Sequence, residues 1–156
     1  MIVLDTNVLS ELMRPQPDPR VLAWADGLDP EAIAITAMNE AEIVHGIARL
    51  PAGQRQERLQ QCWEELMTSL FAGEALPFNG EAAHWYGALV SRRERLARPI
   101  TTADAVIAAT TLAYGAQLAT RNTADFEAIG LELINPWIKP PEAAWPASPV
   151  VPPRLP

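Results

Sequence analysis

The chain has 156 residues, of which 49% are hydrophobic and 20% charged, and its formal net charge is −7. These proportions are ordinary for a folded globular protein and exclude a disordered chain. The length fits one domain with a substantial core. The single cysteine, Cys62, excludes an intramolecular disulfide and a cysteine metal cluster, and favours a reducing compartment.

No stretch of the sequence approaches the roughly 20 apolar residues that a membrane-spanning helix needs. The apolar start is too short for the hydrophobic region of a signal peptide, and it runs directly into Asp5. We therefore expect a cytoplasmic protein without a membrane partner.

The negative net charge argues against nucleic acid as a partner, because phosphate binding usually requires a basic surface. Two features weaken this objection. Acids that share one metal site would add to the negative count while presenting a cation to phosphate. A cluster of arginines could also bind phosphate, or it could be the solvated end of a helix that favours basic residues. The cluster comprises Arg92, Arg93, Arg95 and Arg98.

The first eleven residues are the stretch around which the chain is organised. Four apolar residues, 1–4, run without alternation and stop at Asp5, as in a strand buried on both faces of a parallel sheet. Asp5 then marks the carboxyl end of that strand, where open α/β sheets place their ligands. A buried acid at that position is costly unless the protein uses it.

Capping residues, proline and hydrophobic periodicity place the other elements in chain order. Predicted helices lie at about residues 6–13, 19–28, 37–50, 54–70, 81–97 and 101–113. Predicted strands lie at residues 1–4, 32–35, 74–78, 117–120 and 131–134. Pro77 removes a ladder hydrogen bond and restricts the strand at 74–78 to an edge of the sheet.

This order predicts an α/β fold with three α/β/α layers and a mostly parallel sheet of four to five strands. If the strands at 1–4, 32–35 and 117–120 are neighbours with right-handed crossovers, their carboxyl ends share one edge. From Pro136 onward eight of 21 residues are proline, which predicts an extended, weakly packed tail. We therefore place the domain at residues 1–138 and the tail at 139–156.

The helix at 37–50 carries two acids. A helical wheel puts Glu40 in line with Ile43 and Ile47, whereas Glu42 lies on a different side. Periodicity thus leans slightly to Glu40 and does not select Glu42.

Asp104 begins the most informative helix of the second half. Thr101 and Asp104 have the spacing of a capping box with Asp in place of Glu, so a structural role satisfies the pattern. The residues that follow, 105–113, are apolar nearly all round, which indicates a buried helix and a rigid support for Asp104. The strand at 117–120 ends in a second polar turn, 121–126, in which Arg121 could contact a phosphate or lie on the surface.

Four segments of the chain resemble the four motifs of the PIN-domain family, in the same order and with matching spacing. They are residues 1–11, Ala41-Glu42-Ile43 with Gly46, residues 102–108, and residues 119–126. More narrowly, they are similar to the VapC-type ribonuclease toxins, the subgroup that includes the FitB proteins. The similarity covers about residues 1–138.

The resemblance implies that Asp5, Glu42 and Asp104 form the acidic cluster of the family, and it selects Glu42 where the wheel did not. Some relatives have Asp at the position of Asn122, and others pair Asn there with an acid three residues later, as Asn122 and Asp125 do here. Either residue could complete the site. Asn7 would orient Asp5, which a plain helix cap would also do.

By the same resemblance the catalytic residues would be Asp5, Glu42, Asp104, Asn122 and Asp125. Of these, the four carboxylates would bind Mg²⁺ or Mn²⁺. Oxygen ligands without nearby histidine or cysteine suit these hard cations.

The implied function is an endoribonuclease, the toxin of a type II toxin–antitoxin module, with RNA as substrate and a cognate antitoxin as partner. The implied assembly is a homodimer or a toxin–antitoxin hetero-oligomer. Two alternatives stay open. One is a module of the same fold that binds RNA or protein without cutting. The other is a phosphatase of the haloacid dehalogenase class, whose usual second Asp is here Asn7.

Overall fold

The computed structural model describes residues 1–138, and the predicted proline-rich tail at 139–156 lies outside the described residues. Four parallel strands pair in the order β2-β1-β3-β4. They are β1 (Ile2–Leu4), β2 (Ile33–Ala34), β3 (Gln117–Ala119) and β4 (Leu133–Ile134). This order confirms that the first strand lies between the strands that begin at residues 33 and 117.

Six α-helices and two short 3₁₀ helices connect the strands. The α-helices are α1 (Thr6–Leu12), α2 (Pro19–Asp26), α3 (Ala37–Ala48), α4 (Gln54–Leu70), α5 (Gly80–Arg95) and α6 (Thr102–Ala113). The 3₁₀ helices are η1 (Pro30–Ala32) and η2 (Thr123–Phe126). In the part of the chain that is described, no helix combines the length and the apolar character needed to cross a membrane.

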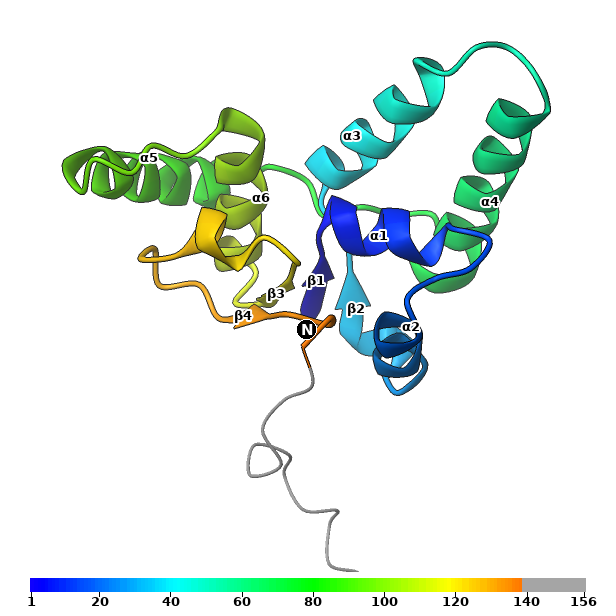
Figure 1. The fold of residues 1–156 in the computed structure, drawn as a ribbon. Coiled ribbons are helices and arrows are strands. Elements are labelled where there is room, and N and C mark those ends of the chain that lie inside the picture. The colour runs from blue at the N-terminus through cyan, green and yellow to red at the C-terminus, as the bar shows by residue number, and fades with distance from the viewer. Residues whose placement is uncertain (139–156) are drawn as a thin grey trace, which may run out of the picture.

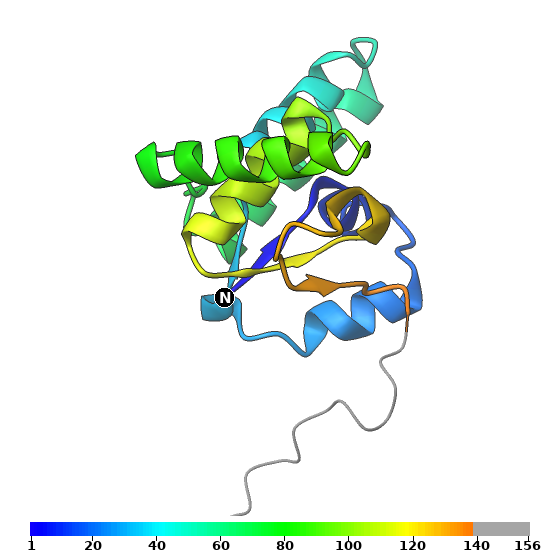
Figure 2. The ribbon, with the colours of Figure 1, turned by 90° about the vertical axis from the view of Figure 1, so that its left-hand side faces the viewer.

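The helices cover both faces of the sheet, as the predicted three-layer fold requires. Successive side chains of a strand point to opposite faces. Leu4 and Ala119 accordingly pack into a core with residues of α1 to α4, whereas Val3 and Leu118 pack with α5 and α6. Figure 1 shows α5 and α6 together on one side of the molecule and α2 to α4 on the other. Figure 2 shows the strands between α5 and α6 above and α2 below.

The predicted edge strand at 74–78 is wrong in extent, because this segment makes only one isolated parallel bridge, between Thr36 and Leu76. The Leu76 amide donates to the Ile35 carbonyl at 2.8 Å, and the Ala37 amide donates to the Leu76 carbonyl at 2.9 Å. Pro77 has no amide hydrogen to continue the ladder. The segment therefore lies beside β2, at the edge of the sheet, without forming a strand.

The register of the sheet brings the ends of β1 and β3 to the same level. Ile2 to Leu4 pair with Gln117 to Ala119, and the Asp5 amide donates to the Ala119 carbonyl at 2.9 Å. Asp5 and Thr120 consequently leave the sheet side by side, at the edge where α1 begins.

Replacement of Leu4 measures how much the core beneath this edge of the sheet contributes to the stability of the fold. The side chain is 1% exposed, so Leu4→Ala should lower the free energy of unfolding by about 2–5 kcal/mol. The 41% exposed Leu22 of α2 is the matched control, and Leu22→Ala should change it by less than about 0.5 kcal/mol. Urea unfolding measures both, and equal effects would contradict this core assignment.

Candidate active site

A pocket of about 500 Å³ opens at the carboxyl edge of the sheet. Its walls come from α1 and the residues that flank it, from α3, from the first turn of α6 and from the turn after β3. The lining residues are Asp5, Thr6, Asn7, Ser10, Glu11, Arg14, Glu42, Asp104 and Asn122. The pocket thus gathers four of the five predicted site residues, from parts of the chain far apart in sequence, and Asp125 is not among those that line it.

Asp5 is buried and held by hydrogen bonds on both carboxylate oxygens. Oδ1 accepts from the amide of Thr6 at 2.8 Å, which makes Asp5 the N-cap of α1. Oδ2 accepts from Asn7 Nδ2 at 3.0 Å and from Thr120 Oγ1 at 2.7 Å. Asn7 therefore does orient Asp5, as predicted, and the carboxylate has one fixed position.

Asn39 is a second support of Asp5 that the sequence analysis missed. It is fully buried and forms a capping box with Thr36 at the start of α3. Its Nδ2 donates to Asp5 Oδ1 at 3.4 Å and to Thr6 Oγ1 at 3.2 Å. Its spacing of three residues from the capping residue Thr36 was the only signal in the sequence.

Glu42 lies on α3, lines the pocket and is hydrogen-bonded to Thr6. The Thr6 hydroxyl donates a hydrogen bond to Glu42 Oε2, so one side chain links the start of α1 to this acid. Glu40, which the wheel favoured slightly, is not among the residues that line the pocket. The buried side of α3 consists of Asn39, Ile43 and Ile47, and Glu42 borders it.

Asp104 lies in the first turn of α6, where the positive end of the helix favours a carboxylate. Thr101 caps this helix, because its Oγ1 accepts from the Asp104 amide at 3.2 Å. The apolar residues that follow are buried as predicted, among them Ala105, Ile107 and Ala108. Asp104 is therefore held at the start of a rigid interior helix and lines the pocket.

The turn after β3 carries the two residues predicted to complete the site. Asn122 lines the pocket, and its backbone amide donates to Thr120 Oγ1 at 3.1 Å. Asp125 lies in η2 with an exposed side chain. The side chain of Arg121 is also exposed, and its guanidinium carbon lies 5.3 Å from the centre of the Trp137 ring, a cation–π distance.

Two carboxylates of this site, those of Asp5 and Asp104, have raised pKa values. Burial raises the pKa of Asp5, and the negative charges of Asp104 and Glu42 raise it further, although hydrogen bonds from Thr120 and Thr6 act in the opposite direction. Burial also raises the pKa of Asp104, and the charge of Asp125 adds to the effect. The negative charges around Asp5 and Asp104 repel one another, and a cation would relieve that repulsion.

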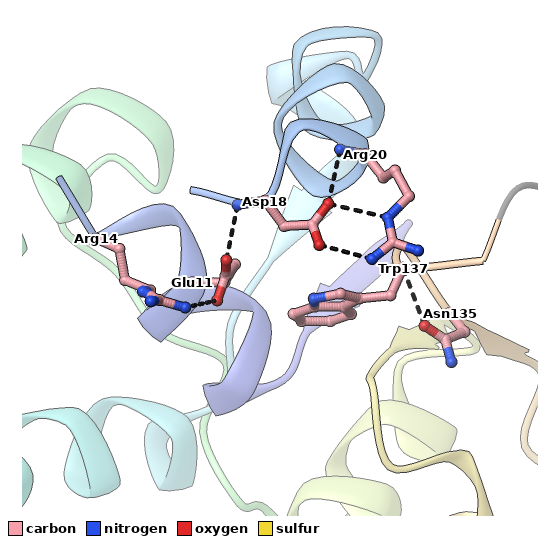
Figure 3. A network of polar contacts seen from close by, with 6 residues as sticks. All are labelled: Glu11, Arg14, Asp18, Arg20, Asn135 and Trp137. Atoms are coloured by element: carbon pink, nitrogen blue, oxygen red, sulfur yellow. Dashed lines mark hydrogen bonds and ion pairs between the residues drawn. The ribbon is translucent and has the colours of Figure 1, made fainter. Parts of the chain in front are cut away.

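Glu11 also lines the pocket, but its buried carboxylate joins α1 to α2 (Figure 3). It accepts from the Asp18 amide at 2.7 Å and pairs with Arg14 at 3.2 Å. Asp18 in turn caps α2, and hydrogen bonds from Arg20 lower the pKa of Asp18 to about 2. Glu11 and Asp18 are therefore explained by structural contacts and need no role in a reaction.

The donor set of the pocket suits a hard divalent cation, because Asp5, Glu42, Asp104 and Asn122 offer only oxygen ligands to it. Within residues 1–138, however, no three Asp, Glu, His or Cys side chains form a ready-made metal site. The chemistry of the residues fits Mg²⁺ or Mn²⁺, and the carboxylates would have to move closer together to bind one ion.

The PIN domain family matches residues 2–131, most of the described chain. This chain belongs to the PIN domain family. The match fits the observed three-layer fold with its parallel sheet, and it sets aside the haloacid dehalogenase alternative.

Two curated relatives of this PIN domain align along nearly their full length. The VapC ribonuclease Y4jK of Sinorhizobium fredii is 44% identical over 137 residues, which cover 88% of this chain and 98% of the relative. The toxin FitB of Neisseria gonorrhoeae is 40% identical over 137 residues, 88% of this chain and 99% of the relative. The crystal structure of FitAcB from the same organism superimposes with a TM-score of 0.82 at 40% identity and covers 88% of this chain and 99% of that one.

The raised pKa values predict how the stability of the metal-free protein depends on pH. A raised pKa means that the folded state binds the proton more tightly than the unfolded chain, so the ionised acid lowers the free energy of unfolding above that pKa. This loss disappears as the pH falls through the raised pKa toward the ordinary value of 3.8. We expect wild type to gain stability relative to Asp104→Asn as the pH falls from about 7 toward about 4.

Urea unfolding in EDTA at several pH values measures this difference. Glu74→Gln, at an exposed site outside the pocket, is the control and should follow wild type. A difference between wild type and Asp104→Asn that stays constant with pH would contradict the raised pKa of Asp104.

Proposed function

We propose that this PIN domain is a Mg²⁺-dependent endoribonuclease and the toxin of a type II toxin–antitoxin module. The observation that carries the proposal is the convergence of Asp5, Glu42 and Asp104 on one pocket at the carboxyl edge of the sheet. The names of the relatives, a ribonuclease and a toxin, support the same activity.

Asp5 and Asp104 would hold the ion, with Glu42 and Asp125 as further ligands, and Mn²⁺ could replace Mg²⁺. When bound, such an ion lowers the pKa of a water molecule and offsets negative charge on the phosphate oxygens.

The protein residues prepare this chemistry by fixing the acids. Asp5 is held in one position by Asn7 and Thr120, so the other carboxylates would move toward it when an ion binds. Glu42 lines the pocket close enough to Asp5 to raise its pKa, where its carboxylate can accept a proton from an attacking water. Asn122 lines the same pocket, and its side-chain amide can donate a hydrogen bond to a phosphate oxygen. The proposed reaction needs no covalent protein intermediate.

One observation favours the alternative, a module of the same fold that binds RNA or protein without cutting. The described residues contain no ready-made set of three metal ligands. Cleavage therefore requires the carboxylates to rearrange around the ion, and a chain that fails to do so would only bind.

RNA cleavage tests the proposal against this alternative. Purified wild type should cut a labelled single-stranded RNA in Mg²⁺ and lose the activity in EDTA. Asp104→Asn and Glu42→Gln should each reduce the rate by at least about 100-fold, since Asp104 would hold the ion and Glu42 would accept the proton of the attacking water.

Glu40→Gln is the matched control for Glu42→Gln, because it makes the same change on the same helix outside the pocket lining. It should cleave like wild type. RNA binding without cleavage by wild type would establish the binding module, and equal loss in both glutamate variants would overturn the role of Glu42.

The partner follows from the charge of the pocket. Several carboxylates repel one another without a cation, and a basic side chain of an antitoxin could take the place of the ion. We further propose that the chain assembles as a homodimer or as a hetero-oligomer with that antitoxin.

Co-expression tests the partner. Induction of the chain alone should arrest growth, and the product of an adjacent open reading frame should restore it and co-elute with the chain in gel filtration. Light scattering of the isolated chain gives its own oligomeric state. Growth that continues when active chain accumulates would contradict a toxin.

A further inference from the structure

Arg93, in the last turn of α5, is 4% exposed, whereas the sequence suggested a solvated basic cluster. Its guanidinium donates three hydrogen bonds, all to backbone carbonyls. Nε donates to the carbonyl of Arg98 at 2.6 Å, and Nη1 donates to those of Asp125 at 2.8 Å and Glu127 at 3.1 Å.

A buried guanidinium is costly unless it is well paired, because it loses its hydration. In the described chain its hydrogen-bond partners are carbonyl dipoles and not a carboxylate. Arg93 therefore carries a net positive charge into the interior. A neutral residue would avoid this cost if the position served only to fill space.

The three carbonyls belong to the two segments that carry acids of the site. Arg98 lies between α5 and α6, three residues before the cap Thr101 and six before Asp104. Asp125 and Glu127 lie in and just after η2. A second contact joins the same segments, since the guanidinium of Arg98 pairs with the carboxylate of Glu127 at 3.0 Å.

These two segments have a reason to separate. Asp104 lies on α6 and Asp125 on η2, two elements that are in contact, and like charges repel one another. A tie between the segments therefore works against the repulsion of the acids that they carry.

We propose that Arg93 is a positioning residue: its guanidinium holds the α5–α6 connection and η2 together so that Asp104 and Asp125 can bind the same divalent ion. This inference rests on the proposed function.

Two effects of removing Arg93 have opposite signs, which makes the inference testable. Loss of a positive charge near the acids would by itself strengthen cation binding, because the local repulsion of the cation falls. Release of the two segments would weaken cation binding, because the ligands are no longer held together. The direction of the change in affinity thus separates positioning from simple charge.

The experiment measures Mn²⁺ binding by isothermal titration calorimetry in the full chain, well below the unfolding temperature. Arg93→Gln should bind Mn²⁺ roughly 10- to 100-fold more weakly than wild type, the usual loss when a group that orients a metal ligand is removed. Arg93→Lys keeps the charge but lacks the planar guanidinium, so its affinity for Mn²⁺ should lie between those of wild type and Arg93→Gln. Arg92→Gln makes the same charge change at the exposed neighbouring position and should bind like wild type.

Hydrogen exchange of the metal-free proteins gives a second readout. Amides at residues 98–104 and 123–127 should exchange faster in Arg93→Gln than in Arg92→Gln. Unchanged or tighter Mn²⁺ binding in Arg93→Gln would overturn the positioning role. If that variant does not fold, Arg93→Lys decides by the same criterion. Absence of Mn²⁺ binding in wild type would instead refute the proposed function, and the inference with it.

Discussion

The candidate site depends on holding several carboxylates together although they repel one another. Burial raises the pKa of Asp5 and of Asp104, and the charges of neighbouring carboxylates raise both further. Such a cluster is unfavourable unless fixed groups stabilise it or a cation binds to it. The side chains of Asn7, Asn39 and Thr120 are fixed groups of this kind, because each donates a hydrogen bond to Asp5.

Helix starts supply much of that support. α1, α3 and α6 are capped by Asp5, Thr36 and Thr101, and each helix contributes at least one residue to the pocket. The unpaired amides of a helix start carry partial positive charge, which stabilises nearby carboxylates. The parallel sheet beneath, packed by apolar side chains on both faces, keeps these starts in register. The packing of the helices on the sheet therefore also determines where the carboxylates of the site lie.

Much of the fold could be predicted because its signals are local. The apolar run 2–4 ending in Asp5, the caps at Thr36 and Thr101, and the apolar helix after Asp104 all appear as expected. The prediction of a strand at 74–78 was wrong because a strand needs a partner strand along its length, and the propensity of a segment does not reveal whether such a partner exists. The segment found a partner only at Leu76.

Three of the four predicted acids, Asp5, Glu42 and Asp104, line the pocket, whereas the residues that hold Asp5 in place could not be predicted. Asn39 and Thr120 reach Asp5 across 34 and 115 positions of the sequence, so no local pattern reports these bonds. Arg93 resembled its exposed neighbours, because burial depends on the η2 segment folding over it. The helical wheel placed Glu40 on the apolar face of α3. The pocket instead is lined by Glu42, which lies beside the buried face of that helix. Motif resemblance, which carries long-range information, selected the acid that lines the pocket.

The double duty of Asp5 has a practical consequence for anyone who needs an inert form of the protein. The same carboxylate starts α1 and accepts bonds from three other side chains, so a replacement there disturbs the surrounding scaffold together with the charge. At the start of α6 two residues share these roles: the Thr101 hydroxyl accepts the hydrogen bond that caps the helix, and the Asp104 side chain lines the pocket. Asp104 is thus the better position at which to silence the protein for trapping an intact nucleic acid or partner in a crystal.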